Sequence, residues 1–312
     1  MPKKVVVVGS GNAALSAGIA ALEKGANVVI YEKADKKMAG GNTKYTAGAM
    51  RFSYENGDQL IDLLKHPDDK RIKDTDFGTY TNEKFSLDLL NFNDGRPLSP
   101  EQNTLVSKSL ETIQWLSSHN IKFEPIYSRQ SFLKDGKHIF WGGLTLASEN
   151  EGVGLFDQEL AAFLSLGGKI HYNSPVTKLI FQNKKVSGVL VNNKSVEADA
   201  VILASGGFEA NDELRKLFIG DDWLKAKVRG TPNNTGDGLK MALDIGAIKH
   251  GLFDGCHATT MDLHMKNYGG LDLEPSERKN YRKICYFLGI MINANGKRFL
   301  DEGKNFRNYT YA

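Results

Sequence analysis

The sequence has few cysteines, and it has no long apolar run. Its 312 residues include two cysteines, Cys256 and Cys285, which lie far apart and form no CxxC pair. Cysteine-based zinc sites and redox dithiols typically use closely spaced cysteines, so no metal site is predicted, and a free thiol fits a reducing compartment. No segment approaches the roughly 18 apolar residues of a membrane helix, and the N-terminus lacks the apolar core of a signal peptide. We therefore expect a cytoplasmic protein without membrane insertion.

The chain also has little net charge. Forty lysines and arginines oppose 37 aspartates and glutamates, which gives a formal net charge of +3. This value is too small to predict binding to nucleic acid or to an anionic membrane surface. Hydrophobic residues make up 41% of the chain, as in ordinary globular proteins. Attraction for an anionic ligand should therefore come from a local site.

The order of apolar runs indicates an α/β fold. Short runs at residues 4–8, 27–31 and 200–204 are typical of buried parallel strands. Helical spacing over residues 13–24 places a helix between the first two runs, and Gly25 is suited to end it. Further helices are predicted over residues 99–118, 155–166 and 237–243, a strand over 169–172, and hairpins over 176–191 and 290–300.

The segment after the first predicted strand has the pattern of a dinucleotide-binding turn. Gly9, Gly11 and Ala14 occupy the three small positions of GxGxxG/A. The first permits a tight turn, the second lets the backbone approach a pyrophosphate, and the third allows close packing of helix and strand. Asn12 and Ala13 open the following helix, whose free N–H groups attract an anion. A glycine-rich turn used only for packing is the alternative.

An acidic residue and a second glycine turn narrow the choice of dinucleotide. Glu32 follows the second strand, where an acidic side chain accepts hydrogen bonds from a ribose and disfavours NADP. This element alone is compatible with FAD or NAD. Gly40 and Gly41 let the backbone approach a flat or charged ligand, and Asn42 and Thr43 add short polar contacts. Simple NAD-binding domains need no such turn here, so FAD is favoured over NAD. The alternative is that these glycines form a surface loop that contacts no ligand.

These motifs resemble those of the FAD-binding flavoproteins of the fumarate reductase/succinate dehydrogenase type. Ala47-Gly48 and the segments 204–208 and 234–238 follow in that family's order, and the resemblance spans residues 5 to about 245. It implies a Rossmann-like FAD-binding domain, with a central parallel sheet, helices and a β-hairpin element, plus an incomplete α+β cap domain. The cofactor-binding residues that it implies are Gly9, Gly11, Asn12, Ala13, Ala14, Glu32, Lys33, Gly40, Gly41, Asn42, Thr43, Ala47, Gly48, Ala204, Ser205, Gly206, Thr235, Gly236 and Asp237.

The resemblance also implies domain boundaries and the mode of cofactor attachment. We expect an FAD-binding domain over residues 1–248, with a helical elaboration over about 51–150, and a partial substrate-capping domain over 249–312. Some family members attach the flavin through a histidine near the glycine turn. Residues 38–50 contain no histidine, so noncovalent FAD is expected. Family members continue beyond residue 312, which implies a C-terminally truncated chain.

Candidate catalytic residues follow from the same resemblance. His257, in His-Ala-Thr, resembles the His-x-Thr element that binds a substrate carboxylate. Arg282, with Arg278 behind it, is the nearest candidate for the family's proton-transferring arginine, although the spacing differs by a few residues. A structural histidine and a solvated charge cluster are the alternatives.

The C-terminal segment looks most like that of tricarballylate dehydrogenases. Residues 296–303 and 306–312 carry this likeness. It implies dehydrogenation of a small, tricarballylate-like polycarboxylate by hydride transfer to flavin N5, with a separate electron acceptor. The same chemistry on fumarate, urocanate or a ketosteroid remains open. So do completion of the site by a second polypeptide and a catalytically inactive FAD-binding remnant.

Overall fold

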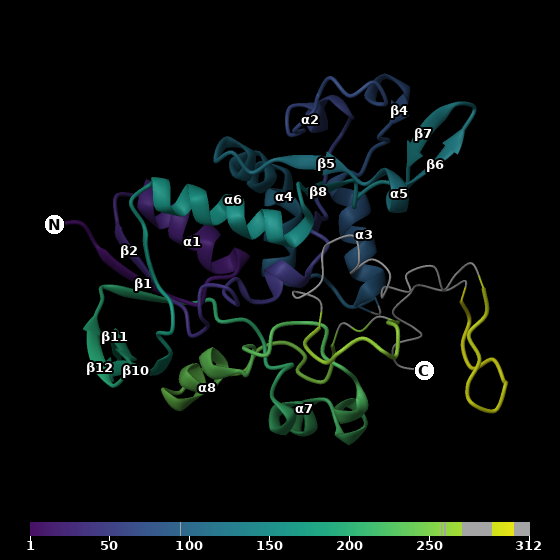
Figure 1. Cartoon of the computed structure of the whole chain (residues 1–312). Coiled ribbons are helices and arrows are strands. Elements are labelled where there is room, and N and C mark those ends of the chain that lie inside the picture. The colour runs from purple at the N-terminus through teal and green to yellow at the C-terminus, as the bar shows by residue number, and fades with distance from the viewer. Residues whose placement is uncertain (94, 257, 259, 270–288, 303–312) are drawn as a thin grey trace.

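A four-stranded parallel sheet forms the centre of the described structure. The computed structural model describes residues 1–302 except residues 94, 257, 259 and 270–288 (Figure 1). The sheet order is β13–β1–β2–β9, and these strands comprise Ala200–Leu203, Lys4–Val8, Asn27–Tyr31 and Lys169–His171. The predicted α/β fold with a parallel sheet is confirmed.

The strands of this sheet end at the same level. Val8 at the end of β1 pairs with Leu203 of β13 on one side and with Tyr31 of β2 on the other. Tyr31 in turn pairs with His171 of β9. In a parallel sheet the carboxyl ends of all strands point to one edge. The loops that follow β1, β2 and β13 therefore begin side by side.

The alternating side chains of β1 build a core on each face of the sheet. Val5 and Val7 pack with helices α1 (Asn12–Glu23) and α6 (Glu151–Ser165), which run side by side over one face (Figure 1). The alternate valines, beginning with Val6, point to the opposite core. Because successive side chains of a strand point to opposite faces, one run of valines anchors both layers.

A three-stranded antiparallel sheet covers the second face. It contains β10 (Val176–Gln182), β11 (Lys185–Val191) and β12 (Lys194–Glu197), and helix α8 (Asp237–Asp244) adds Met241 to the same core. Strands β10 and β11 form the predicted hairpin. The sequence does not predict β12, because this short strand is mostly exposed and has no apolar alternation.

Local sequence signals set several helix ends as predicted. Helix α4 (Pro100–Ser118) begins with a capping box. The Ser99 hydroxyl accepts a hydrogen bond from the Gln102 N–H, and the Gln102 side chain accepts one from the Ser99 N–H. Helix α1 ends before Gly25, whose φ of +77° suits a glycine. Helix α6 begins about one turn earlier than predicted.

The segment 51–150 is less helical than predicted. It forms its own core around Phe52, Tyr54, Phe123 and Leu146. Its strands are short and pair mostly with segments distant in sequence. Strands of two to four residues are too short to show an alternation of apolar and polar residues, so the sequence does not predict them. Besides α4 and the start of α6, the elements in and beside this segment are β3 (Ala49–Met50), α2 (Asp58–Ile61), η2 (Ile72–Asp74), β4 (Thr75–Asp76), α3 (Asn82–Phe92), β5 (Phe123–Pro125), α5 (Tyr127–Gln130), β6 (Ser131–Lys134), β7 (Lys137–Phe140) and β8 (Leu146–Ser148).

Turns and short helices dominate the described chain after β13. Helix α7 (Asp212–Phe218) and the 3₁₀ turn η3 (Asp221–Lys225) precede α8. In the predicted C-terminal hairpin, Gly296 has a φ of +71° and the pairing is limited to one bridge between Ile292 and Arg298. Much of the predicted cap domain lies outside the described residues, so its boundary near residue 248 stays a prediction.

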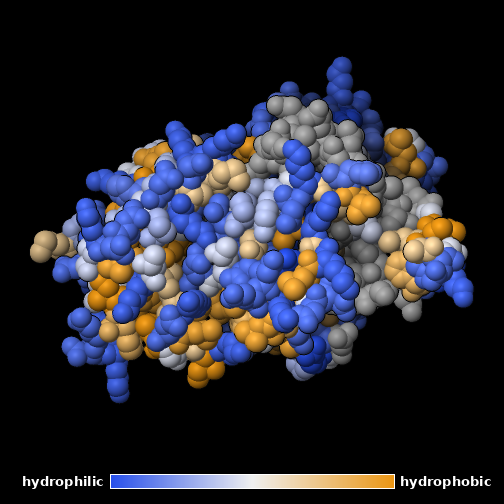
Figure 2. Space-filling view, turned by 60° about the horizontal axis from the view of Figure 1, so that its bottom comes forward, coloured by the Kyte–Doolittle hydropathy of each residue, from blue (hydrophilic) through white to orange (hydrophobic). Residues whose placement is uncertain are grey.

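The face of the molecule shown in Figure 2 is predominantly polar. Hydrophilic residues cover most of the face in Figure 2, and apolar residues are interspersed among them. Within the described residues, we find no helix that combines the length and the apolar composition needed to cross a membrane.

Phe163 of α6 supplies a test of this packing. Its ring is fully buried and fills the space beside Gly18 and Gly168. Phe163→Ala should lower the free energy of unfolding by about 3–5 kcal/mol, because it leaves a cavity between α6 and α1. The exposed neighbour Leu164 is the control, and Leu164→Ala should change stability by about 0.5 kcal/mol or less. Urea unfolding measures both free energies. Equal losses of stability in the two variants would contradict the burial of Phe163 between α6 and α1.

Candidate dinucleotide-binding site

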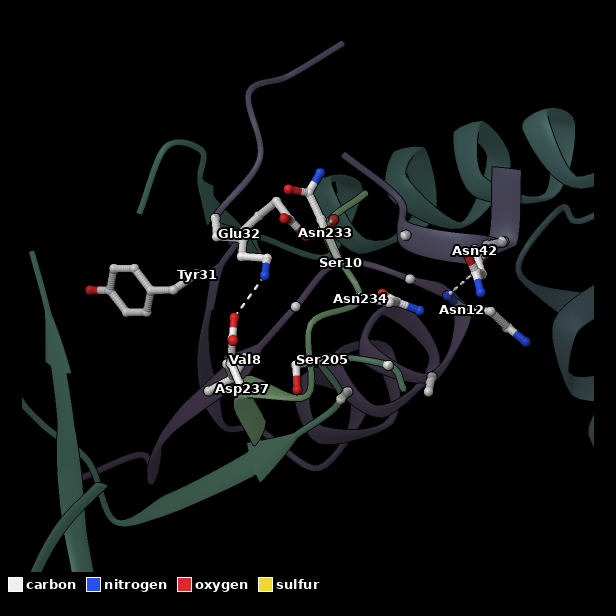
Figure 3. A pocket seen from close by; sticks show the side chains of 18 of the residues that line it. Val8, Ser10, Asn12, Tyr31, Glu32, Asn42, Ser205, Asn233, Asn234 and Asp237 are labelled. Atoms are coloured by element: carbon white, nitrogen blue, oxygen red, sulfur yellow. Dashed lines mark hydrogen bonds and ion pairs between the residues drawn. The ribbon is translucent and has the colours of Figure 1, made fainter. Parts of the chain in front are cut away.

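A pocket lies at the carboxyl ends of β1, β2 and β13 (Figure 3). This edge of an open α/β sheet is where ligands commonly bind. The lining residues come from the loops after these three strands, from the second glycine turn and from the start of α8. They are Val8, Gly9, Ser10, Gly11, Asn12, Ala13, Tyr31, Glu32, Lys33, Met38, Gly41, Asn42, Thr43, Val176, Ala204, Ser205, Gly206, Asn233, Asn234 and Asp237.

The first glycine of the fingerprint permits a close approach of two loops. The N–H of Gly9 donates to the carbonyl of Tyr31, and the N–H of Ala204 donates to the carbonyl of Val8, each at 2.9 Å. Gly9 has a φ of +99°, and a Cβ at this position would lie 2.5 Å from the Ala204 carbonyl oxygen. Only glycine fits here without displacing the loop after β13.

The N-terminus of α1 faces the pocket with little side-chain cover. The Asn12 N–H donates to Oγ1 of Thr43 at 2.8 Å. Among the described residues, the Ala13 N–H has no hydrogen-bond partner. A Cβ on Gly11 would lie 3.2 Å from Oγ1 of Thr43 and 3.5 Å from the Gly40 carbonyl oxygen. Glycine at this position therefore leaves a narrow space through which a ligand can reach the helix start. A free N–H at a helix start suits a pyrophosphate.

Glu32 is held in one orientation at the end of β2. Its side chain is buried, with 6% of its surface exposed. The Ser10 hydroxyl donates to Oε2 at 2.6 Å, and the Ala34 N–H donates to Oε1 at 2.7 Å. The Gly40 N–H donates to the Ser10 hydroxyl at 3.0 Å. Each carboxylate oxygen keeps a further lone pair, so Glu32 can still accept hydrogen bonds from ribose hydroxyls.

Lys33 connects the end of β2 to the start of α8. Its ammonium group lies 2.7 Å from Oδ2 of Asp237 and donates to Oγ1 of Thr235 at 2.7 Å. In Figure 3 a dashed line marks the ion pair that Asp237 makes, and Ser205 lies close to Asp237. Both side chains are partly exposed, so the ion pair contributes at most about 1 kcal/mol. Its main effect is to fix the position of two pocket residues.

Glu209 joins three loops behind the pocket. Its Oε1 accepts hydrogen bonds from the side-chain amides of Asn42 at 2.5 Å and Asn234 at 2.8 Å. The Asn42 Oδ1 accepts from the Thr231 N–H at 2.9 Å. The sequence prediction misses Glu209, Ser10, Asn233 and Asn234. Asn233 and Asn234 adjoin or belong to the 234–238 motif, but no local signal marks Glu209.

Several predicted residues lie behind the pocket instead of lining it. Ala14 is fully buried in the core beside β1. Gly40 has a φ of +106° and packs against Phe156, and Gly48 lies against Ser148. Their contact with a cofactor stays a prediction, as it does for Ala47, Thr235 and Gly236. The catalytic candidates His257 and Arg282, and Arg278, lie outside the described residues.

The described residues fit a dinucleotide. The free N–H at the helix start, the glycine approach and the oriented carboxylate lie around one pocket at the sheet edge, as a pyrophosphate and a ribose require. Within the described chain, no group of three or more histidine, cysteine or carboxylate side chains could hold a metal ion.

Known proteins share this sequence pattern. The chain is similar to a fumarate reductase (cytochrome) from Shewanella frigidimarina, at 29% identity over 307 residues, which covers 96% of this chain and 47% of the relative. It is also similar to an NADH:acrylate oxidoreductase from Vibrio harveyi, at 28% identity over 359 residues, which covers 96% of this chain and 33% of the relative. The chain thus spans about half, or less, of the length of these curated relatives.

A solved structure and a family match agree with these relatives. The open conformation of a flavocytochrome c3 fumarate reductase is 26% identical, with a TM-score of 0.59, and the match covers 79% of this chain and 41% of that one. The expected likeness to fumarate reductase flavoproteins is confirmed, and the cofactor is FAD. The sequence model of the FAD binding domain matches residues 4–310, and the chain therefore belongs to the FAD binding domain family.

Proposed function

We propose that this chain carries the FAD-binding part of an oxidoreductase that acts on a carbon–carbon bond of a small carboxylate. The pocket at the sheet edge supports this function, because its helix N-terminus and buried acid suit a dinucleotide. The names of the relatives give fumarate and acrylate, which are both unsaturated carboxylates. We therefore infer that the reacting group is a carbon–carbon bond next to a carboxylate.

Different residues of the pocket would contact different parts of FAD. The Ala13 N–H and the open space at Gly11 would hold the pyrophosphate. Glu32 would hold the adenosine ribose, and Asn42 and Thr43 would lie along the flavin side. When bound, FAD supplies hydride transfer, and the protein supplies orientation and exclusion of water.

The proposed substrate is a tricarballylate-like polycarboxylate. His257 would donate a hydrogen bond to one substrate carboxylate. Arg282 would accept the proton from the carbon next to the one that loses hydride, and neighbouring cations would have to lower its pKa for this task. The electrons would leave for a separate acceptor. The support for this substrate is the likeness of residues 296–303 and 306–312 to tricarballylate dehydrogenases.

Flavin binding is the first test of this function. The purified protein should absorb near about 450 nm, as oxidised flavins do, and acid precipitation should release the flavin because attachment is noncovalent. Gly11→Val should lower FAD affinity at least about tenfold, since the new side chain enters the approach beside Thr43. Ala20→Val, on the exposed face of the same helix, should leave affinity unchanged. A colourless protein that takes up no added FAD would contradict the function.

Turnover is the second test. Tricarballylate with an artificial acceptor should be oxidised, and His257→Ala and Arg282→Ala should each lower kcat about 100-fold or more. The exposed His264 is the matched control, and His264→Ala should keep the original rate. Activity only on fumarate, urocanate or a ketosteroid would refute the substrate. An FAD-loaded chain without any turnover would refute catalysis by this chain alone.

A further inference from the structure

A carboxyl group is buried in the core between α1 and α6. Glu159 has none of its surface exposed and lies on the face of α6 between Phe156 and Phe163. Its only hydrogen-bond partner among the described residues is the Ser16 hydroxyl of α1, which lies 2.9 Å from Oε1. Oε2 has no partner there. Glu159 differs in this respect from Glu32, both of whose carboxylate oxygens accept a hydrogen bond.

Among the described residues, no cation pairs with a negative charge on Glu159. Of the elements that pack against α6, β8 carries no titratable group. Glu23 of α1 pairs with His119, and the Lys44 ammonium of η1 (Gly41–Tyr45) lies over the Phe156 ring. The remaining titratable groups on these elements are Tyr45 of η1 and Glu151 and Asp157 of α6 itself. None of these groups hydrogen-bonds to Glu159.

The buried carboxyl is therefore protonated at neutral pH. An ionised carboxylate without a cation is costly in an apolar core. Burial raises the pKa of Glu159 to about 8, although the Ser16 hydrogen bond opposes this shift.

Ser16 connects this carboxyl to the pocket. Its hydroxyl oxygen lies 2.9 Å from Oε1 of Glu159 and 3.2 Å from Oδ1 of Asn12. A serine hydroxyl has one hydrogen, so it can donate to only one of these oxygens. With Oδ1 of Asn12 facing Ser16, as in this structure, the second short contact needs a proton on Glu159. With that proton, Glu159 donates to Ser16 and Ser16 donates to Asn12.

We propose that Glu159 is a positioning residue for the FAD site, whose proton sets the direction of the Glu159–Ser16–Asn12 hydrogen-bond chain. Because Oδ1 of Asn12 accepts from Ser16, the Nδ2 group of the same amide is left to donate to the pyrophosphate. Asn12 is suited to this role, since it lines the pocket in the first turn of α1, on the same side as Asn42 (Figure 3). The inference rests on the proposed position of the pyrophosphate at this helix start.

Loss of the proton reverses the chain. An ionised Glu159 accepts from Ser16, and the Ser16 oxygen then accepts from Nδ2 of Asn12. The amide would turn its Oδ1 towards the anionic pyrophosphate, and a negative charge would be added behind the helix start. FAD therefore binds the protonated form more tightly, and its affinity falls as the pH rises through the pKa of Glu159, which is about 8.

The test is the FAD dissociation constant of the apoprotein as a function of pH, followed by quenching of flavin fluorescence. From about pH 6 to about pH 9.5 the affinity of the original protein should fall roughly tenfold or more. Glu159→Gln should keep its affinity over this range, because glutamine donates to Ser16 at every pH. Asp157→Asn, an exposed change on the same helix, should keep the original pH profile.

Ser16→Ala provides a second variant in case Glu159→Gln does not fold, which circular dichroism would reveal. It interrupts the hydrogen-bond chain, so the fall of its affinity with pH should become shallower than in the original protein, with only the charge of Glu159 left to act. Parallel pH profiles for the original protein and either folded variant would overturn the positioning role alone. Absence of FAD binding at every pH would overturn the proposed function and this inference with it.

Discussion

The common end of the central strands is the constraint on which the site depends. Val8, Leu203 and Tyr31 lie in register, so three loops leave the sheet at one level. The close contact of Gly9 with the Ala204 carbonyl joins two of these loops, and a side chain at Gly9 would separate them. The pocket forms where they meet. A change that shifted this register would displace the helix start and the ribose acid together.

Two buried carboxyl groups near the site differ in their hydrogen bonds. Glu32 accepts from the Ser10 hydroxyl and from a backbone N–H, which compensates for the loss of water around its oxygens. Glu159 has one partner for two oxygens, and burial raises its pKa to about 8. The first group suits an acceptor for ribose hydroxyls. The second suits a hydrogen-bond donor that orients its neighbours.

Local patterns predicted the parts of the fold and site that depend on nearby residues. The turn at Gly9 and Gly11, the acid Glu32 and the capping box at Ser99 are of this kind, because each depends on residues close in sequence or on one strand–helix–strand unit. Contacts between distant segments escaped prediction. Asn42 and Glu209 are 167 positions apart, and no local spacing marks their contact. Gly152 and Gly154 at the start of α6 disfavour a helix by propensity, yet a Cβ on Gly152 would clash with Thr43 of η1 and one on Gly154 with the preceding turn at Glu149.

A crystal structure of the protein with FAD tests the central claim most directly. The account predicts that a pyrophosphate oxygen lies within about 3.2 Å of the Ala13 N–H and that a ribose hydroxyl donates to Glu32. Nδ2 of Asn12 should face the pyrophosphate. FAD bound away from the ends of β1 and β2, or with its ribose far from Glu32, would contradict the account.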